Sequence, residues 1–219
     1  MFIFPAPTQQ TIKDLLPVFE MFNGLCIGYH IDIMDGLFVP STQGSMELVN
    51  QFPQYTDNQL WIHLMVHNPQ EYIEQLTIPE ESIITFHYEA VELDEAEYCA
   101  QLIKQKNMRP SLAINPNTPL SGPLCLINEF DHFLIMAVQP GTSGQPFIQK
   151  TTTRLKELDI YRKTQNSHLS LAVDGGITQD IIPTLQSLHV DHASVTSGIF
   201  NTPNPAASFK LLQQKKESF

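Results

Sequence analysis

The chain has 219 residues, of which 42% are hydrophobic and 16% charged, a composition that suits a folded protein with a sizeable core. Its formal net charge of −11 argues against nucleic-acid binding, which needs a basic surface, and it repels anionic ligands at long range. Any phosphate site must therefore rely on local backbone N–H groups and helix N-termini.

The cysteines and the N-terminal segment bear on the compartment. Cys26, Cys99 and Cys125 are odd in number and scattered, which predicts reduced packing residues in a reducing compartment. The N-terminus lacks a basic region, and its apolar run ends at Pro5. No segment approaches the length that spans a membrane. We therefore expect a cytoplasmic protein without membrane contact.

Eight short apolar runs predict β-strands, and the amphipathic stretches between them predict helices. No Pro-, Ser- or Gly-rich linker divides the chain, so we expect residues 1–219 to form a single α/β domain, a closed (β/α)8 TIM barrel. After the fifth strand, Thr118 before Pro119 predicts a helix N-cap. The strands are expected near residues 2–5, 26–33, 59–65, 82–87, 109–114, 132–138, 168–173 and 191–195.

The helix expected after the fourth strand has a recognisable inner face. Small and apolar residues recur there at helical spacing, which predicts that they pack against the sheet. They are Ala96, Cys99, Ala100 and Ile103.

The second predicted strand carries polar side chains on one face. Because side chains alternate along a strand, His30, Asp32 and Met34 share a face, while Ile31 and Ile33 take the other. A buried strand normally fills both faces with branched apolar residues. A buried histidine beside a carboxylate needs a partner, and a divalent metal is a natural one.

Two further strands add residues of the same kind. His63 lies on the third strand, and Asp174 ends the seventh, at the barrel end where active sites are built. The set of His30, Asp32, His63 and Asp174 suits one Zn²⁺, Fe²⁺, Mn²⁺ or Co²⁺ ion per chain, and the sequence does not choose among them. Any one of these residues alone would more simply be a buried, hydrogen-bonded polar group. His87, at the end of the fourth strand, is equally consistent with a partner behind a ligand and with a satisfied core histidine.

Three methionines fall at inward positions near strand ends, namely Met34, Met65 and Met136. Core filling is the default explanation for methionine. Because all three lie beside the polar cluster, we interpret them as an apolar lining that keeps water from a reactive intermediate.

Glycine-bearing loops follow the sixth, seventh and eighth strands. The loops after the last two strands commonly hold phosphate in this architecture, because short loops that enter helices present free N–H groups to an anion. We therefore predict a phosphate site formed by Gly141, Thr142, Ser143, Gly144, Gly175, Gly176, Thr196 and Ser197.

Several motifs in one order give the chain a family resemblance. They are residues 30–40 (HIDIMDGLFVP), 63–66 (HLMV), 85–89 (TFHYE), 115–119 (NPNTP), 136–141 (MAVQPG) with Gly144 and Gln145, and 173–177 (VDGGI). In these motifs the chain resembles the ribulose-phosphate 3-epimerase family of metal-dependent (β/α)8 barrels, over nearly its whole length.

The resemblance implies a reaction and assigns roles to residues. The family interconverts D-ribulose 5-phosphate and D-xylulose 5-phosphate in the pentose phosphate pathway. His30, Asp32, His63 and Asp174 match its metal ligands, of which Asp32 and Asp174 double as the acid–base pair and His63 also belongs to the substrate site. The glycine-bearing loops match its phosphate-binding positions. We expect C3 inversion through a 2,3-enediolate, a phosphosugar substrate as partner, and assembly into a homo-oligomer.

The chain departs from the family pattern at some substrate-facing positions. Ala6 replaces a serine of the first strand, Ser41-Thr42-Gln43 replaces a segment with an asparagine, and Thr142-Ser143 replaces a bulky apolar residue and a glycine. Thr196 replaces a glycine, a change that is costly if the backbone there needs a positive φ. These changes leave two alternatives open: the same chemistry on another ketose phosphate, such as a ketohexose 6-phosphate, or a non-catalytic barrel that binds a phosphosugar.

Overall fold

The computed structural model describes residues 1–166 and 168–214, and within them nine strands form one sheet. Eight strands run parallel, and each overlaps a strand predicted from the sequence. These are β1 (Phe2–Pro5), β2 (Gly28–Asp35), β4 (Gln59–Met65), β5 (Ile83–His87), β6 (Arg109–Ile114), β7 (His132–Met136), β8 (Ser170–Asp174) and β9 (His192–Val195). The ninth, β3 (Thr42–Gln43), is a two-residue strand antiparallel to β2 that the sequence did not predict.

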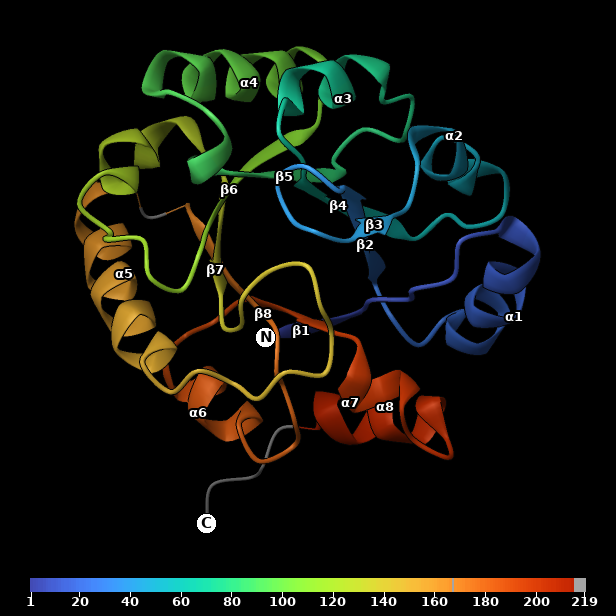
Figure 1. The fold of residues 1–219 in the computed structure, drawn as a ribbon. Coiled ribbons are helices and arrows are strands. Elements are labelled where there is room, and N and C mark those ends of the chain that lie inside the picture. Colours follow the sequence, from blue (N-terminus) through green and yellow to red (C-terminus); the bar gives the residue numbers. More distant parts are fainter. Residues whose placement is uncertain (167, 215–219) are drawn as a thin grey trace.

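The parallel strands curl into a barrel with helices around the outside (Figure 1). The ladder runs β1-β9-β8-β7-β6-β5-β4-β2, and β1 and β2, at the two ends of this series, contact each other. The predicted (β/α)8 architecture is therefore confirmed. The α-helices are α1 (Ile12–Phe22), α2 (Met46–Val49), α3 (Pro69–Gln75), α4 (Leu93–Gln105), α5 (Thr151–Gln165), α6 (Ile182–Ser187), α7 (Ser197–Phe200) and α8 (Pro205–Gln213).

The helix after β5 packs as its spacing predicts. All four inner residues of α4 are buried, and the helix begins with a capping box in which Glu92 and Glu95 satisfy each other's backbone N–H groups. A short 3-10 helix, η2 (Tyr88–Ala90), joins β5 to α4. Another, η1 (Phe52–Gln54), precedes β4.

The predicted helix start at Thr118-Pro119 is wrong. Residues 116–122 form turns, and the 3-10 helix η3 (Pro123–Glu129) begins after Gly122. The hydroxyl of Thr118 donates a hydrogen bond to the carboxylate of Glu89. Thr118 therefore fixes its own loop to Glu89 of η2 and does not cap a helix.

The barrel interior has its own apolar core. The residues packed there include Phe4, Trp61, Ile83, Ala113, Leu134, Met136, Val138 and Ala172. The indole N–H of Trp61 donates to the Thr85 hydroxyl at 2.8 Å, and the edge of the indole meets the ring of His30. Trp61 thus forms the floor beneath the polar residues at the carboxyl end of the strands.

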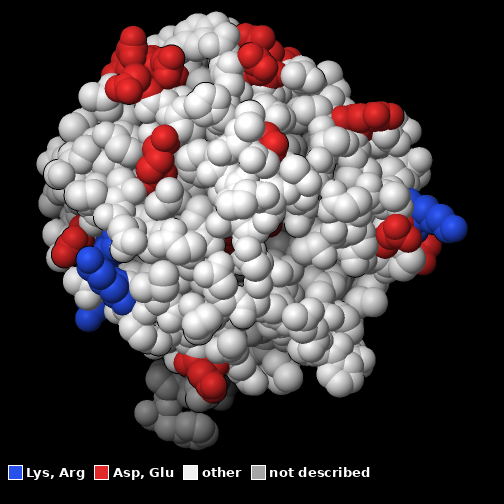
Figure 2. All heavy atoms as spheres, in the orientation of Figure 1, with Lys and Arg blue, Asp and Glu red and all other residues white. Residues whose placement is uncertain are grey.

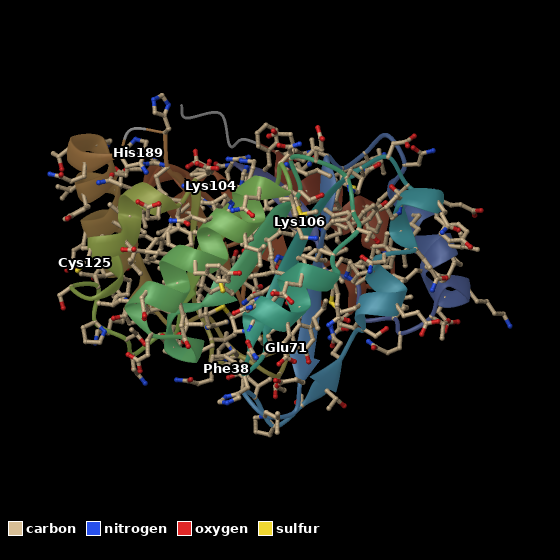
Figure 3. All side chains as sticks on the ribbon, turned by 90° about the horizontal axis from the view of Figure 1, so that it is seen from above. Phe38, Glu71, Lys104, Lys106, Cys125 and His189 are labelled. Atoms are coloured by element: carbon tan, nitrogen blue, oxygen red, sulfur yellow. The ribbon has the colours of Figure 1, made fainter. Side chains whose placement is uncertain are left out.

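Different residues lie at the two ends of the barrel. Viewed from the side, Phe38, in the loop after β2, and Glu71 lie at one end, whereas Lys104 and His189 lie at the other (Figure 3). Among the helices of residues 1–166 and 168–214, none combines the length and apolar character that crossing a membrane requires.

Candidate active site

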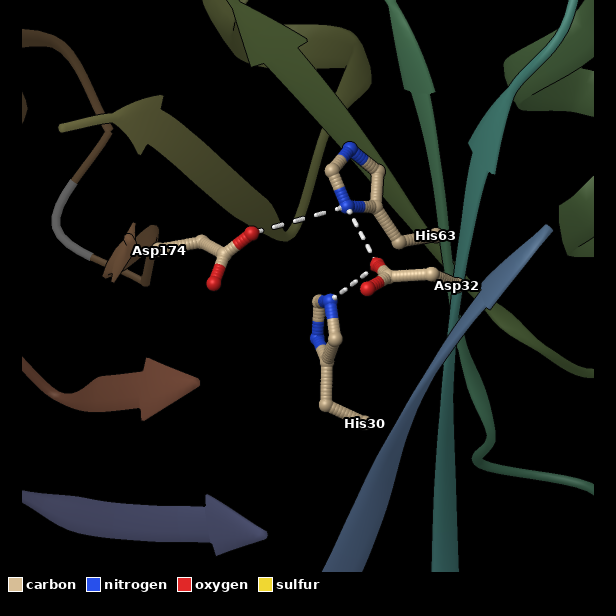
Figure 4. A group of neighbouring side chains, drawn as sticks. All are labelled: His30, Asp32, His63 and Asp174. Carbon is tan, nitrogen blue, oxygen red and sulfur yellow. Dashed lines mark hydrogen bonds and ion pairs between the residues drawn. The ribbon is translucent and has the colours of Figure 1, made fainter. Parts of the chain in front are cut away.

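The structure brings together the four predicted metal ligands at the carboxyl end of the barrel strands (Figure 4). His30 and Asp32 share the inner face of β2, and the parallel register sets Asp32 opposite His63 of β4. Asp174 reaches the same point from the last residue of β8. One potential ligand atom from each of the four residues lies within 4.8 Å of the others.

Asp32 lies at the centre of the cluster. Its Oδ1 is 3.0 Å from His30 Nε2 and 3.2 Å from His63 Nδ1. His63 Nδ1 is also 3.9 Å from Oδ2 of Asp174. Both imidazoles are fully buried, whereas the two carboxylates keep limited access to solvent.

The residues fit a divalent ion. His63 Nδ1 faces oxygens of both aspartates, and His30 Nε2 faces Asp32, so two nitrogens and two carboxylates converge on one point. A neutral imidazole and a carboxylate both offer lone pairs, and a cation is the partner that satisfies both. This mixed nitrogen and oxygen set suits Zn²⁺, Fe²⁺, Mn²⁺ or Co²⁺.

The environments of the two aspartates move their pKa values in opposite directions. Burial alone would raise the pKa of Asp32, but the charges and hydrogen bonds of His30 and His63 outweigh it and bring the pKa well below its usual range. Burial raises the pKa of Asp174, and the nearby charge of Asp32 adds to this. Such a separation is typical of a base paired with an acid.

A cavity opens above the cluster, with Asp32 and Asp174 at its base. Figure 2 shows the hollow near the centre of this face, with acidic atoms deep inside it. The Lys and Arg side chains visible in this view lie at the outer edges of the molecule. All three predicted lining methionines, Met34, Met65 and Met136, border the cavity.

The predicted phosphate-site residues after β7, β8 and β9 all line the same cavity, from Gly141 to Gly144, at Gly175-Gly176 and at Thr196-Ser197. Gly176 has a φ of +66°, and a Cβ there would collide with the backbone N of Phe147. Glycine at 176 thus permits both the left-handed turn and the close approach of two loops. Among the described residues that line the cavity there is no lysine or arginine, so an anion held there would meet backbone N–H groups and hydroxyls.

The substitution at Thr196 does not strain the backbone. Thr196 has φ −98°, outside the left-handed region that favours glycine. A threonine can therefore adopt the backbone conformation at position 196, and this conformation does not need the glycine expected from the family resemblance.

Four polar lining residues lie outside the site that was predicted from the sequence, namely Thr8, Gln43, Ser194 and, in the loop after β7, Gln139. Gln43 reaches the cavity because β3 pairs with β2 opposite Met34. Thr8 follows β1, and Ser194 lies opposite Asp174 in the β8–β9 register. The polar residues His192 and Ser194 alternate along β9, and this pattern could have predicted that Ser194 faces the barrel interior. The two residues of β3 are too few to show a period, so the sequence could not place Gln43 in this way.

His87 is fully buried and lies directly behind His63. Its Nε2 is 2.8 Å from His63 Nε2, and its Nδ1 is 3.3 Å from Oε2 of Glu89. Burial lowers the pKa of His87 to about 4, which keeps the imidazole neutral at pH 7. Of the two explanations that the sequence left open, the geometry favours a partner behind a ligand.

Comparison with known proteins identifies the family of the chain. The model of the ribulose-phosphate 3 epimerase family matches residues 9–200. The ribulose-phosphate 3-epimerase, cytoplasmic isoform, of Oryza sativa subsp. japonica is 34% identical over 191 residues, covering 86% of this chain and 82% of the rice protein. The Bacillus subtilis (strain 168) ribulose-phosphate 3-epimerase is 32% identical over 179 residues, covering 81% and 79%.

Solved structures share the fold. KGPDC from Streptococcus mutans superposes with a TM-score of 0.71 at 11% identity, covering 97% of this chain and 95% of that one. The 3-hexulose-6-phosphate synthase of Salmonella typhimurium gives 0.70 at 15% identity, covering 97% and 96%. The family match over most of the chain, with relatives above 30% identity, shows that the chain belongs to the ribulose-phosphate 3-epimerase family and is an isomerase acting on carbohydrates.

Proposed function

We propose that the protein interconverts D-ribulose 5-phosphate and D-xylulose 5-phosphate by inverting C3 in the pentose phosphate pathway, with one divalent metal ion held by His30, Asp32, His63 and Asp174. The observation that carries this proposal is the pairing of Asp32 and Asp174 above the buried histidines, with oxygens of the two carboxylates within 4.8 Å of each other.

Inversion at C3 requires removal of the proton next to the C2 carbonyl and delivery of a proton to the opposite face. Asp32 and Asp174 come from β2 and β8, which β9 and β1 separate in the barrel. The lowered pKa of Asp32 suits a base in the resting enzyme, and the raised pKa of Asp174 suits an acid. In the reverse direction the two exchange roles, and each positioned group contributes on the order of 10²–10⁴-fold.

The two histidines and two aspartates would hold the metal. A bound ion would supply Lewis-acid stabilisation of the negative charge that develops on the substrate during proton removal. The three methionines around the cavity would limit water at C3, where solvent could otherwise protonate the intermediate without control.

The glycine-bearing loops would anchor the phosphate. Interactions there position C3 between the two carboxylates, so remote binding energy contributes to turnover. The KGPDC of Streptococcus mutans has been crystallised in complex with D-R5P, and that barrel superposes on this chain with a TM-score of 0.69. This supports a phosphosugar as the ligand class of the cavity.

A second candidate is the same reaction on a longer ketose phosphate, such as a ketohexose 6-phosphate. The polar side chains of Thr8, Gln43 and Ser194 favour it, because they offer hydrogen-bonding groups to the additional CHOH unit of the longer sugar. Family membership and the presence of both carboxylates argue against the non-catalytic alternative.

We also propose a cytoplasmic location and a homo-oligomeric assembly. Three free cysteines and a rice relative named as a cytoplasmic isoform support the location.

The test compares ribulose 5-phosphate, free ribulose and a ketohexose 6-phosphate, with metal content measured in parallel. We expect about one divalent ion per chain, loss of that ion in His63→Ala, and kcat/KM far higher for ribulose 5-phosphate than for free ribulose. Similar kcat/KM for the phosphorylated and free sugars would contradict the phosphate site. A full metal complement in His63→Ala would remove His63 from the ligand set.

A further inference from the structure

A chain of hydrogen-bonding groups runs behind the candidate metal site, away from the cavity. His63 Nε2 lies 2.8 Å from His87 Nε2, and the two rings are nearly parallel with centroids 5.0 Å apart. His87 Nδ1 in turn lies 3.3 Å from Oε2 of Glu89. Every member of the chain except Glu89 is fully buried, so water does not substitute for these contacts.

The direction of each hydrogen bond follows from Glu89. Its Oε1 already accepts from the backbone N–H of Asn115 at 2.8 Å and from the hydroxyl of Thr118. An ionised carboxylate has no proton to give, so Nδ1 of His87 must carry the hydrogen that faces it. In a neutral imidazole this leaves Nε2 of His87 as an acceptor.

The same logic fixes the tautomer of His63. Because Nε2 of His87 accepts, Nε2 of His63 must carry a hydrogen, and Nδ1 is then the nitrogen of His63 whose lone pair a cation can take. That nitrogen is the one that faces Asp32 at 3.2 Å and Asp174 at 3.9 Å. Glu89 thus determines, through two rings, which nitrogen of His63 is available to a cation.

The loop that holds Glu89 is itself fixed by a buried guanidinium. Arg154, 6% exposed, donates to the carbonyl oxygens of Asn115 and Pro116 at 2.8 Å each and to that of Thr118 at 2.5 Å. The two donors to Glu89 Oε1 therefore belong to a rigid turn. Their geometry would persist if the side chain at 89 changed.

We propose that His87 and Glu89 are positioning residues that hold His63 with its proton on Nε2 and with Nδ1 aimed at the metal. This inference rests on the proposed metal site and adds residues that do not touch the ion. Partners of this kind raise ligand basicity and fix ring orientation, and their loss typically weakens metal affinity by about 10–100-fold.

Glu89→Gln is the most informative variant because it reverses the direction of the hydrogen bonds from residue 89 through His87 to His63 while it keeps the shape of the side chain. The donors from Asn115 and Thr118 keep the amide oxygen at the Oε1 position, so the NH2 group faces His87. His87 Nδ1 must then accept, His87 Nε2 must donate, and the proton on His63 moves to Nδ1, where it blocks the metal. Glu89→Asp remains acceptor-only and should retain the parent tautomer. Glu97→Gln, at an exposed position of α4, is the matched control.

The experiment titrates Co²⁺ into metal-free protein by calorimetry and visible absorption, and reads the His63 tautomer from imidazole ¹⁵N shifts. We expect about 10–100-fold weaker Co²⁺ binding in Glu89→Gln and near-parent binding in Glu89→Asp and Glu97→Gln. Nε2 of His63 should carry a proton in the parent and in both control variants, and should lose it in Glu89→Gln. A urea unfolding curve of each metal-free variant separates this effect from lost stability.

Parent-like Co²⁺ affinity in Glu89→Gln, or the absence of a proton on His63 Nε2 in the metal-free parent, would overturn this proposal. Failure of the proposed function looks different: the parent itself would not bind Co²⁺, or His63→Ala would bind it as tightly as the parent. Should Glu89→Gln not fold, the tautomer in the parent and the affinity of Glu89→Asp still decide the inference.

Discussion

The two carboxylates at the base of the cavity differ in pKa because their surroundings differ. Asp32 contacts two buried imidazoles, whereas Asp174 meets one of them at a longer distance and lies beside a strand that ends in Ser194. The same carboxyl group therefore favours its charged form in one place and its neutral form in the other. In the proposed mechanism, this difference in pKa lets one aspartate start as the base and the other as the acid.

Ser194 provides a test at this scale. Its side chain is 1% exposed and lines the cavity, and its hydroxyl has no hydrogen-bond partner among the described residues. Ser194→Ala should leave the metal-free stability unchanged or slightly raised, because a buried unsatisfied hydroxyl is removed. Its kcat/KM should fall by about 10-fold, the value of one hydrogen bond to substrate. An unchanged kcat/KM, measured beside urea unfolding, would show that the hydroxyl takes no part in turnover.

At the scale of elements, the barrel strands were predictable because period-two alternation and apolar runs survive in a short window. The cluster of His30, Asp32, His63 and Asp174 followed, since strand ends in a parallel barrel meet at one edge. The segments between strands were less predictable. Thr118 matched a helix cap in sequence but bonds to Glu89, a partner 29 residues away that no local pattern encodes.

The loop after β8 gives the prediction at this scale. Gly176→Ala would place a Cβ against the backbone of Phe147, in the loop after β7, while Gly24→Ala has a similar φ of +68° and no atom within 4 Å. Gly24→Ala therefore measures the cost of the left-handed backbone alone, about 1 kcal/mol. Gly176→Ala should be more destabilised and should raise KM for ribulose 5-phosphate by about 10-fold or more, as the phosphate loops separate. Equal unfolding free energies and an unchanged KM in the two variants would argue against close packing of these loops.

The barrel interior holds a second group of buried histidines, which Trp61 separates from His30 of the candidate metal site. Ser111 Oγ lies 2.7 Å from His132 Nδ1, and His132 Nε2 lies 3.0 Å from His192 Nδ1. Burial lowers the pKa of His132 well below its usual value and that of His192 to about 4, and Arg109 lowers both further. The folded state therefore takes up protons at these sites less readily than the unfolded chain does.

This difference predicts lower stability in acid. Between pH 6.5 and about pH 4 the unfolded chain binds a proton at His192 that the folded protein does not, so the free energy of unfolding falls as the pH falls. The loss due to His192 between pH 7 and pH 5 should be about 2 kcal/mol. His192→Gln keeps a hydrogen-bonding side chain without titrating, so its unfolding free energy should decline less over this range. Parallel decline of the parent and His192→Gln in urea curves at pH 7, 6 and 5 would contradict this account.

The central claim is that two carboxylates exchange protons with opposite faces of C3, and Asp174→Asn in the metal-loaded enzyme tests it most directly. Asparagine keeps the shape and a ligand oxygen but cannot shuttle a proton at neutral pH. We predict that epimerisation falls by at least ~10²-fold. In D2O, one epimer should still exchange its C3 proton through Asp32 without inverting. Near-normal epimerisation by Asp174→Asn with its metal bound would contradict the two-carboxylate mechanism and require a different base.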